Sequence, residues 1–206
     1  NGLYRSIDAG ETYTQVSGAG AGLPSGSVTD LIADPNDDEV YFAGVAGSGV
    51  YRSDDGGATW TSVNNAVLSS NAALGSSTAV MLAAHPAGGT TRVYAMISYD
   101  DGDPANPPAV VPQVFTSTDS GVSWTELATV TAGFESGFGN LYTDMASDQI
   151  IVDPADATIV YIAKGYGGSP MLLRYDPSGP DWDQIESVGA VGSTRPHVDH
   201  RDLQFV

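Results

Sequence analysis

The sequence has no cysteine and only one lysine, Lys164. The chain therefore has neither disulfide bonds nor cysteine-based zinc sites. Seven basic residues face 25 acidic ones, which gives a formal net charge of −18. Such a charge repels phosphate groups and anionic membrane surfaces and attracts cations. It argues against nucleic acid as a partner and fits a solvated acidic surface in a saline or extracellular environment.

Long apolar runs are also missing, since no stretch approaches the roughly 20 apolar residues of a membrane-spanning helix. We therefore expect no membrane insertion. The opening stretch, NGLYRSIDAG, has no signal-peptide pattern and begins in the middle of a repeat. No long window shows helical periodicity with capping residues, so we expect little helix.

What the chain does contain is a short motif that occurs three times. The copies are YRSIDAGETY (4–13), YRSDDGGATW (51–60) and FTSTDSGVSW (115–124), which share the pattern S-x-D-x-G-x-[TS]-[WY]. A second element alternates with this box: LIADPNDDEVYFAG (31–44), LAAHPAGGTTRVYAM (82–96) and IIVDPADATIVYIAK (150–164). A decayed fourth copy of the box lies at 172–185, where Trp182 takes the place of the aromatic residue.

The segments between these signals are short and rich in Val, Tyr, Thr and Ile, which is typical of strands. Each repeat then holds about four antiparallel strands, the pattern of a propeller blade. We predict an all-β fold, a β-propeller with four-stranded antiparallel blades, of which about three and a half are present as a partial ring. The expected units are 1–27 (the end of a blade), 28–79, 80–147, 148–198 and 199–206 (the start of the next).

The acidic residues of the box allow two interpretations, chemistry or turn formation. A carboxylate can accept hydrogen bonds from amides two or three residues ahead, glycine can adopt positive φ, and the aromatic ring can lie beneath the turn. A catalytic group is normally unique, whereas this motif recurs in each unit. We therefore predict a structural role for its residues: Ser6, Asp8, Gly10, Ser53, Asp55, Gly57, Trp60, Ser117, Asp119, Gly121 and Trp124.

With three such boxes at blade spacing, the chain resembles the Asp-box, or BNR-repeat, β-propellers. The pairing of the box with VDP-x-x-x-x-x-VY looks more like the sortilin-type and xyloglucanase-type branches than like sialidases. The sialidase Arg-Ile-Pro signature is absent, and Arg5 and Arg52 lie beside boxes, which leaves few arginines for a sialidase triad. The resemblance implies a sialidase-like fold, but enzymes and non-enzymes share it.

The long loops expected opposite the boxes are 64–79, 98–113 and 131–148, and the third offers both aromatic and acidic side chains. Such a mixture suits the stacking of a sugar ring, and paired carboxylates can hydrolyse a glycosidic bond. Alternatively, the aromatic residues cover the core and the acids face solvent. The candidate ligand-binding residues are Phe134, Phe138 and Tyr142, and the candidate catalytic residues are Glu135, Asp144 and Asp148.

Two further clusters have both a functional and a structural interpretation. His197 and Asp199 lie on one side of an expected strand entry, as a ligand-binding or metal-binding pair or as hydrogen-bonding groups at a blade junction. The loop YDDGDPANPP supplies hard oxygen ligands for calcium at Asp100, Asp101 and Asp103, or it is simply a solvated acidic loop. Calcium is the one cofactor that the sequence indicates.

Two functions from different classes remain open. The first is a secreted or surface-exposed interaction module that recognises protein or polysaccharide. The second is a fragment of a xyloglucanase-type glycoside hydrolase that uses paired carboxylates. We favour the first because no carboxylate pair stands out in the sequence. In either case, the rest of a longer chain or an assembly is needed to close the propeller.

Overall fold

The computed structural model describes residues 2–69, 74–100, 110–127, 149–166, 169–179 and 181–185. These residues form one two-stranded sheet and three four-stranded sheets, all antiparallel. In each sheet the strands lie side by side in chain order. This confirms the predicted all-β class and the four-stranded units.

In each four-stranded sheet the first strand is the inner one, and the last strand is short, with two or three residues. The sheets are β1 (Tyr4–Arg5) and β2 (Thr14–Gln15); β3 (Val28–Asp34), β4 (Asp37–Val45), β5 (Gly49–Ser53) and β6 (Thr61–Ser62); β7 (Ser77–Ala87), β8 (Thr90–Asp100), β9 (Val110–Ser117) and β10 (Thr125–Glu126); β11 (Gln149–Val152), β12 (Val160–Tyr166), β13 (Ser169–Tyr175) and β14 (Trp182–Gln184).

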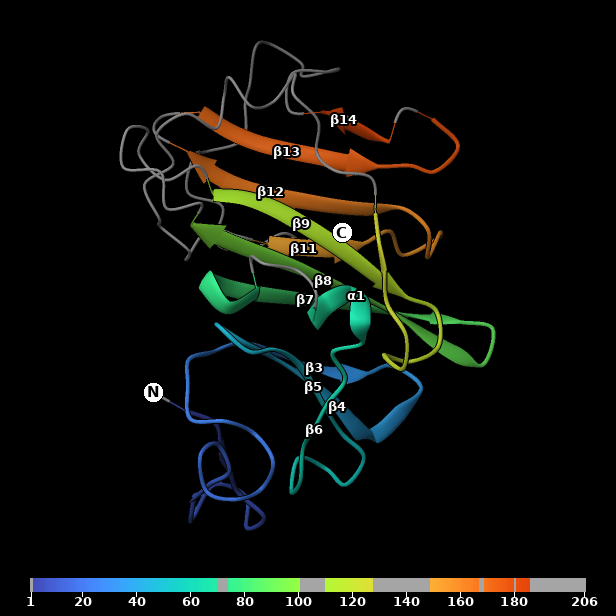
Figure 1. Ribbon diagram of the computed structural model, residues 1–206. Coiled ribbons are helices and arrows are strands. Elements are labelled where there is room, and N and C mark those ends of the chain that lie inside the picture. The colour runs from blue at the N-terminus through green and yellow to red at the C-terminus, as the bar shows by residue number, and fades with distance from the viewer. Residues whose placement is uncertain are drawn as a thin grey trace.

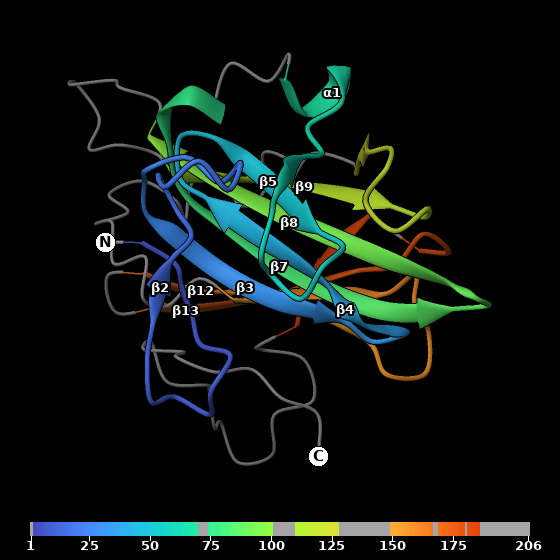
Figure 2. The same ribbon diagram turned by 90° about the horizontal axis from the view of Figure 1, so that it is seen from below.

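The three larger sheets pack face to face in chain order, as Figure 1 shows from bottom to top. Their first strands contact one another, β3 with β7 and β7 with β11. Seen from below, the β3–β6 sheet lies over the β7–β10 sheet (Figure 2). Four-stranded sheets that follow one another with their first strands in contact form part of a β-propeller. Together with β1 and β2, the three sheets amount to about three and a half blades.

Alternation along the strands explains why both faces of a blade are apolar. Val93, Ala95 and Ile97 of β8 face the core layer shared with the β3–β6 blade, whereas Tyr94 and Met96 face the layer shared with the β11–β14 blade. Because successive side chains point to opposite faces of a strand, one apolar run supplies two cores.

The Asp-Pro sequences end the first strand of two blades. The carboxylate of Asp34 accepts a hydrogen bond from the Asn36 amide at 2.8 Å, and that of Asp153 accepts one from the Ala155 amide at 2.9 Å. A short acidic side chain that binds the amide two residues ahead reverses the chain. The next strand begins at Asp37 in the first of these blades and at Val160, after a longer connection, in the other.

Helix is scarce in the described part of the chain, as expected. The one α-helical turn, α1, covers Ala66–Ser69, and a 3-10 turn, η1, covers Leu74–Ser76. Some expected loop boundaries were wrong, because β8 continues through Asp100 and β9 begins at Val110, inside the expected loop 98–113. Tyr99 pairs with Val111 in this extension.

Candidate functional site

The box of the β3–β6 blade forms a closed network of hydrogen bonds around Asp55. Its carboxylate accepts bonds from the Ser53 hydroxyl at 2.8 Å, the Ala58 amide at 3.0 Å, and the Thr59 amide and hydroxyl at 2.8 and 2.6 Å. The Ser53 hydroxyl oxygen in turn accepts a bond from the Gly57 amide at 2.9 Å. These bonds satisfy amides that have no partner in a sheet ladder.

The other two boxes repeat this network. The Asp8 carboxylate accepts bonds from the Thr12 amide at 2.9 Å and the Ser6 hydroxyl at 2.7 Å. The Asp119 carboxylate accepts them from the Ser123 amide at 2.8 Å and the Ser117 hydroxyl at 2.7 Å. The same residue types at the same spacing therefore give the same turn three times.

These hydrogen bonds favour the ionised form of the box carboxylates. Those from Thr12 to Asp8 and from Thr59 to Asp55 lower the pKa of each carboxyl from 3.8 to about 2. Burial alone would raise the pKa of Asp119, but the hydrogen bonds that it accepts in its own turn lower it overall. A carboxyl group with a lowered pKa is a poor proton donor near neutral pH.

The aromatic residue of the box differs between repeats in its surroundings. Trp60 and Trp124 are 4% and 3% exposed, whereas Tyr13 at the same position is 66% exposed. Trp124 packs with Phe42 and other residues of the preceding blade. The box aromatic of one blade thus contributes to the core that the blade shares with the one before it.

The decayed fourth copy keeps part of this arrangement. The Asp176 carboxylate accepts bonds from the Ser178 amide and hydroxyl at 2.9 and 2.6 Å and from Arg174 at 2.6 Å. The pKa of Asp176 falls to about 2, chiefly through the Ser178 hydroxyl. Trp182 is buried, and its ring lies 5.3 Å from that of Tyr175. Asp176 thus takes a turn-forming position without the full box pattern.

Two arginines, one before each of the first two boxes, reach the box of the next blade. Arg5 Nε donates to the Gly56 carbonyl at 2.7 Å, and an Nη of Arg52 donates to the Ser120 carbonyl at 2.9 Å. Both acceptors are backbone groups in a turn, so each arginine links one blade to the following one. The Tyr-Arg-Ser triplet at two of the three boxes is the only sequence feature that accompanies this link.

Asp30 of β3 is a partly buried carboxyl group that the sequence analysis did not single out. Its two oxygens accept bonds from the Leu82 amide of β7 at 2.7 Å and from the Leu31 amide at 2.8 Å. Burial raises its pKa, and the two amide bonds oppose this shift. Asp30 therefore joins the inner edges of two blades through a charge-assisted hydrogen bond.

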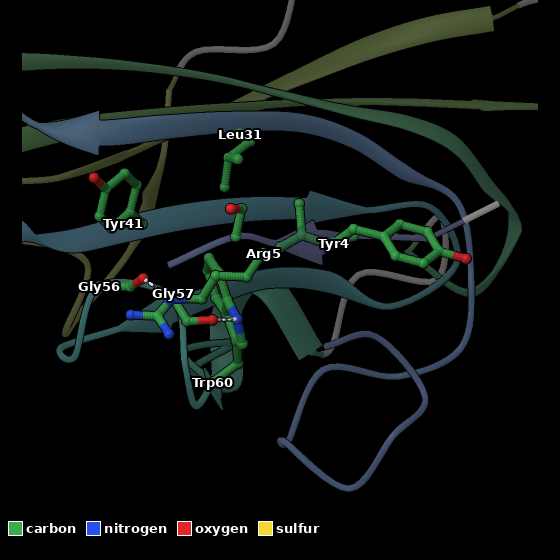
Figure 3. Close-up of a pocket in the computed structure, with 9 residues that line it drawn as sticks. Tyr4, Arg5, Leu31, Tyr41, Gly56, Gly57 and Trp60 are labelled. Carbon is green, nitrogen blue, oxygen red and sulfur yellow. Dashed lines mark hydrogen bonds between the residues drawn. The ribbon is translucent and has the colours of Figure 1, made fainter. Parts of the chain in front are cut away.

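A pocket of about 280 Å³ lies between β1 and the β3–β6 blade. In Figure 3, Leu31 and Tyr41 lie above Arg5 and Trp60 lies below it, whereas the ring of Tyr4 points away from these side chains. The pocket is partly apolar, and none of the residues predicted from sequence to bind a ligand lines it. Its lining residues are Leu3, Tyr4, Arg5, Ser6, Leu31, Tyr41, Gly56, Gly57 and Trp60.

Most of the residues predicted to act on a ligand lie outside the described part of the chain. Asp100 is described as the last residue of β8, with its backbone paired to Val110. Among the described residues, no group of three or more His, Asp or Glu side chains could hold a metal ion. The predicted residues outside the described ranges are Asp101, Asp103, Phe134, Glu135, Phe138, Tyr142, Asp144, Asp148, His197 and Asp199.

The described sheets define the class of protein, a β-propeller built from four-stranded blades. No protein-family model matches the chain, and no curated protein matches it. Within the described ranges, no helix is long and apolar enough to span a membrane.

Several solved structures are similar to the chain. One is the GH74 xyloglucanase from Xanthomonas campestris, with 19% identity and a TM-score of 0.48 over 80% of this chain and 23% of that one. An ancestral GH74 enzyme has 16% identity and a TM-score of 0.44 over 89% of this chain and 28% of that one. YCF48 bound to D1 peptide has 17% identity and a TM-score of 0.28 over 88% of this chain and 60% of that one. The chain thus spans about a quarter of the length of the two GH74 structures. At such identities and TM-scores, the similarities do not assign an activity.

Proposed function

We propose that the chain is part of an Asp-box propeller that serves as a secreted or surface-exposed interaction module, recognising glycan or protein. The observation that carries this proposal is that the box carboxylates are engaged in hydrogen bonds within their own turns. Asp8, Asp55 and Asp119 each accept several hydrogen bonds within their own turn, and their pKa values are lowered. Groups committed in this way stabilise turns and are not suited to acid catalysis.

Binding then falls to the opposite face, where the loops carry no repeated motif. The turn between β4 and β5 lies at that end, and Ser27 lies beside it, because its carbonyl accepts a hydrogen bond from the Ala46 amide at 3.0 Å. β8 ends at the corresponding position with Asp100. Loops on a rigid scaffold are the usual place for a binding site. The aromatic and acidic residues of 131–148 are our candidates for sugar contacts.

The absence of cysteine makes a face-by-face test direct, because a single introduced cysteine can be labelled with a bulky maleimide. Ser27→Cys places the label opposite the boxes, and Val122→Cys places it on a box turn, where Val122 is 67% exposed. The probe is xyloglucan in affinity gel electrophoresis, with a mixed-linkage β-glucan beside it. We expect the label at residue 27 to weaken retardation by xyloglucan and the label at 122 to leave it unchanged.

The aromatic candidates are tested in the same assay. Tyr142→Ala should reduce retardation, whereas Tyr13→Ala, which removes an exposed tyrosine from a box turn, should not. Equal effects of the two labels, or no retardation by either glucan, would exclude the glycan-binding form of the proposal. Release of reducing ends that Asp144→Asn or Asp148→Asn abolishes would instead favour the hydrolase.

Calcium binding to Asp100, Asp101 and Asp103 is a separate part of the proposal. Three carboxylates in one short loop supply oxygen ligands of the kind that calcium prefers. A bound ion stabilises the folded state, so calcium should raise the melting temperature, and Asp101→Asn should diminish that rise. An equal rise with magnesium would indicate general screening of the acidic surface and would argue against a specific site.

A further inference from the structure

His85 lies at the junction between the β7–β10 and β11–β14 blades, between two backbone carbonyl groups. Its ring atom Nδ1 is 2.7 Å from the carbonyl oxygen of Pro86, and Nε2 is 3.3 Å from that of Pro154 in the next blade. A carbonyl oxygen can only accept a hydrogen bond, so each ring nitrogen needs a proton to bond. A neutral imidazole has one N–H group, whereas the imidazolium ion has two. Both bonds of His85 therefore form only when the ring is protonated.

The two bonds of the ring differ in length and in what they connect. The shorter bond, from Nδ1 to Pro86, stays within β7, and the longer one, from Nε2 to Pro154, crosses to the next blade. The better bond retains the single proton of a neutral ring, which leaves a lone pair on Nε2 facing the Pro154 carbonyl oxygen. Deprotonation of His85 thus turns an attractive contact between the blades into a repulsive one.

The turn that carries Pro154 is also held by a donor that keeps its proton. The Tyr94 hydroxyl group donates to the Ala157 carbonyl at 2.7 Å, and burial raises the pKa of Tyr94. Within the turn, the Asp153 amide donates to the Ile159 carbonyl at 2.9 Å, and the Ile159 amide donates back to the Asp156 carbonyl at 3.1 Å. One permanent donor and one protonation-dependent donor therefore hold the same closed turn.

Charged groups on both sides of the junction act on the ring. Arg92 lies opposite His85 in the ladder between β7 and β8, and its charge opposes a second cation. The turn of the next blade contains Asp153 and Asp156. Hydrogen bonds from the side chain and amide two residues ahead, and to a smaller extent Arg92, lower the pKa of Asp156, whereas Asp176 raises it. The acidic turn thus offsets the charge of Arg92.

The preceding junction has a different link at the same repeat position. Asp34, which aligns with His85, accepts a hydrogen bond from the Thr91 hydroxyl group of the next blade. The donor and the acceptor are therefore exchanged between the two junctions. Histidine is the side chain that normally changes its charge between about pH 5 and 8, so the link at His85 is the one that depends on protonation in this range.

We propose that His85 is a pH-responsive link between the β7–β10 and β11–β14 blades, closed when the imidazole is protonated and open when it is neutral. The protonated ring is the form that gains a partner on folding. Its contribution to stability is therefore present at the acid end of the range from about pH 5 to 8 and is lost as the pH rises. The link does not depend on the function proposed above.

Nitrogen NMR of the imidazole rings in the 206-residue protein reads the protonation state directly. The chain has three histidines, and His85→Gln identifies the signals of His85 by their loss. We expect both ring nitrogens of His85 to carry protons near pH 5 and Nδ1 alone to carry one near pH 8. A neutral ring protonated on Nε2 would keep the bond to Pro154 at high pH and would overturn the proposal.

Hydrogen exchange of the Ile159 amide measures how tightly the turn is held. Exchange is expressed relative to an unfolded peptide at the same pH, which removes the pH dependence of the exchange chemistry. Protection should fall about threefold to tenfold between about pH 5 and 8, the usual effect of one hydrogen bond, and should stay constant in His85→Gln. The Val80 amide, which donates to Thr29 at the preceding junction, is the internal control and should not respond.

Tyr94→Phe is the matched variant, because it removes the other donor to the turn and leaves His85 in place. Phe42 occupies the same repeat position, so a phenylalanine ring suits this site. The variant should lower the protection of Ile159 at both pH values and keep the pH response. A response that persists in His85→Gln would assign it to the carboxylates, and an equal response of Val80 would assign it to the whole fold; either result refutes the link.

Discussion

The indole nitrogen of Trp124 donates a hydrogen bond of 3.0 Å to the backbone carbonyl of Val63, in the chain that follows the last strand of the preceding blade. Trp124 is 3% exposed and packs into the core layer between the two blades. A single side chain thus supplies both apolar burial and a polar link across the junction.

Replacement of Trp124 should therefore weaken the packing between the two blades and lower the stability of the fold. We expect Trp124→Ala to lower the free energy of unfolding by about 3–5 kcal/mol, the usual cost of deleting a large buried aromatic. Tyr13→Ala is the control at the same box position, and it should change stability by no more than about 0.5 kcal/mol because Tyr13 is 66% exposed. Urea denaturation measures both, and similar losses would refute the inter-blade role of Trp124.

The box carboxylates should make the protein sensitive to acid. Hydrogen bonds, first of all from Thr59, lower the pKa of Asp55 from 3.8 to about 2 on folding. The ionised form is therefore favoured in the folded state, so its contribution is present above pH 3.8 and is lost as the pH falls towards 2. Asp55→Asn should lower stability at neutral pH and flatten the decline over this window, as measured by urea midpoints at each pH.

Asp54→Asn provides the matched control for this pH experiment. Asp54 is the neighbouring residue and carries the same charge, but its carboxylate pairs with Arg52 at the surface, with 67% of the Asp54 side chain exposed. Exposed ion pairs contribute little to stability. The acid-induced decline should persist in this variant, and equal flattening in both variants would point to net charge as the cause.

The hydrogen bonds of each box could be anticipated from spacing, because they link residues no more than four positions apart. The alternation of apolar residues likewise predicts the strands. The bonds of Arg5 and Arg52 could not be anticipated, since each arginine contacts a turn more than 50 residues away. Such contacts depend on how blades pack. The expected loop 131–148 and the segment around His197 and Asp199 have no repeated counterpart in the sequence, so nothing in the sequence predicts which side chains meet there.

His85 shows how a repeat can mislead. In the repeat it aligns with Asp34 and Asp153, and this alignment predicts that His85 takes the place of aspartate in the turn. In the structure it lies within β7, opposite Arg92, and the chain reverses later, between Ala87 and Thr90. The two glycines in between have φ of 62° and 97°, which a tight hairpin requires. The turn in this blade therefore lies at Gly88 and Gly89, after the position of His85.

Gly57 and Gly121 occupy the same box position with nearly equal φ, +81° and +85°. A Cβ on Gly121 would lie 2.7 Å from the buried ring of Phe42, whereas a Cβ on Gly57 would lie 3.6 Å from the ring of Trp60, an ordinary contact distance. Gly57→Ala should cost about 1–2 kcal/mol from the left-handed backbone alone. Gly121→Ala should cost about 1–3 kcal/mol more, because the methyl group must displace Phe42. Urea denaturation compares the two variants, and equal costs would show that Phe42 can move aside freely.

Thr29 offers a test of how the inner strands are held together. Its hydroxyl group donates to the Val80 carbonyl at 2.8 Å and accepts from the Val80 amide at 2.9 Å, so one side chain satisfies two backbone groups on the inner edge of β7. Thr29→Val keeps the shape but leaves both groups without this partner, and the expected loss of stability is about 1–3 kcal/mol.

Thr29→Ser is the matched variant, because it keeps the hydroxyl group and removes only a methyl group. It should retain more stability than Thr29→Val, and the Val80 amide should stay protected from hydrogen exchange, whereas in Thr29→Val that amide should exchange faster. If Thr29→Val were as stable as the parent and its Val80 amide equally protected, the hydroxyl bridge would not link β3 to β7. In that case apolar packing and the Asp30 bond to Leu82 would account for the junction.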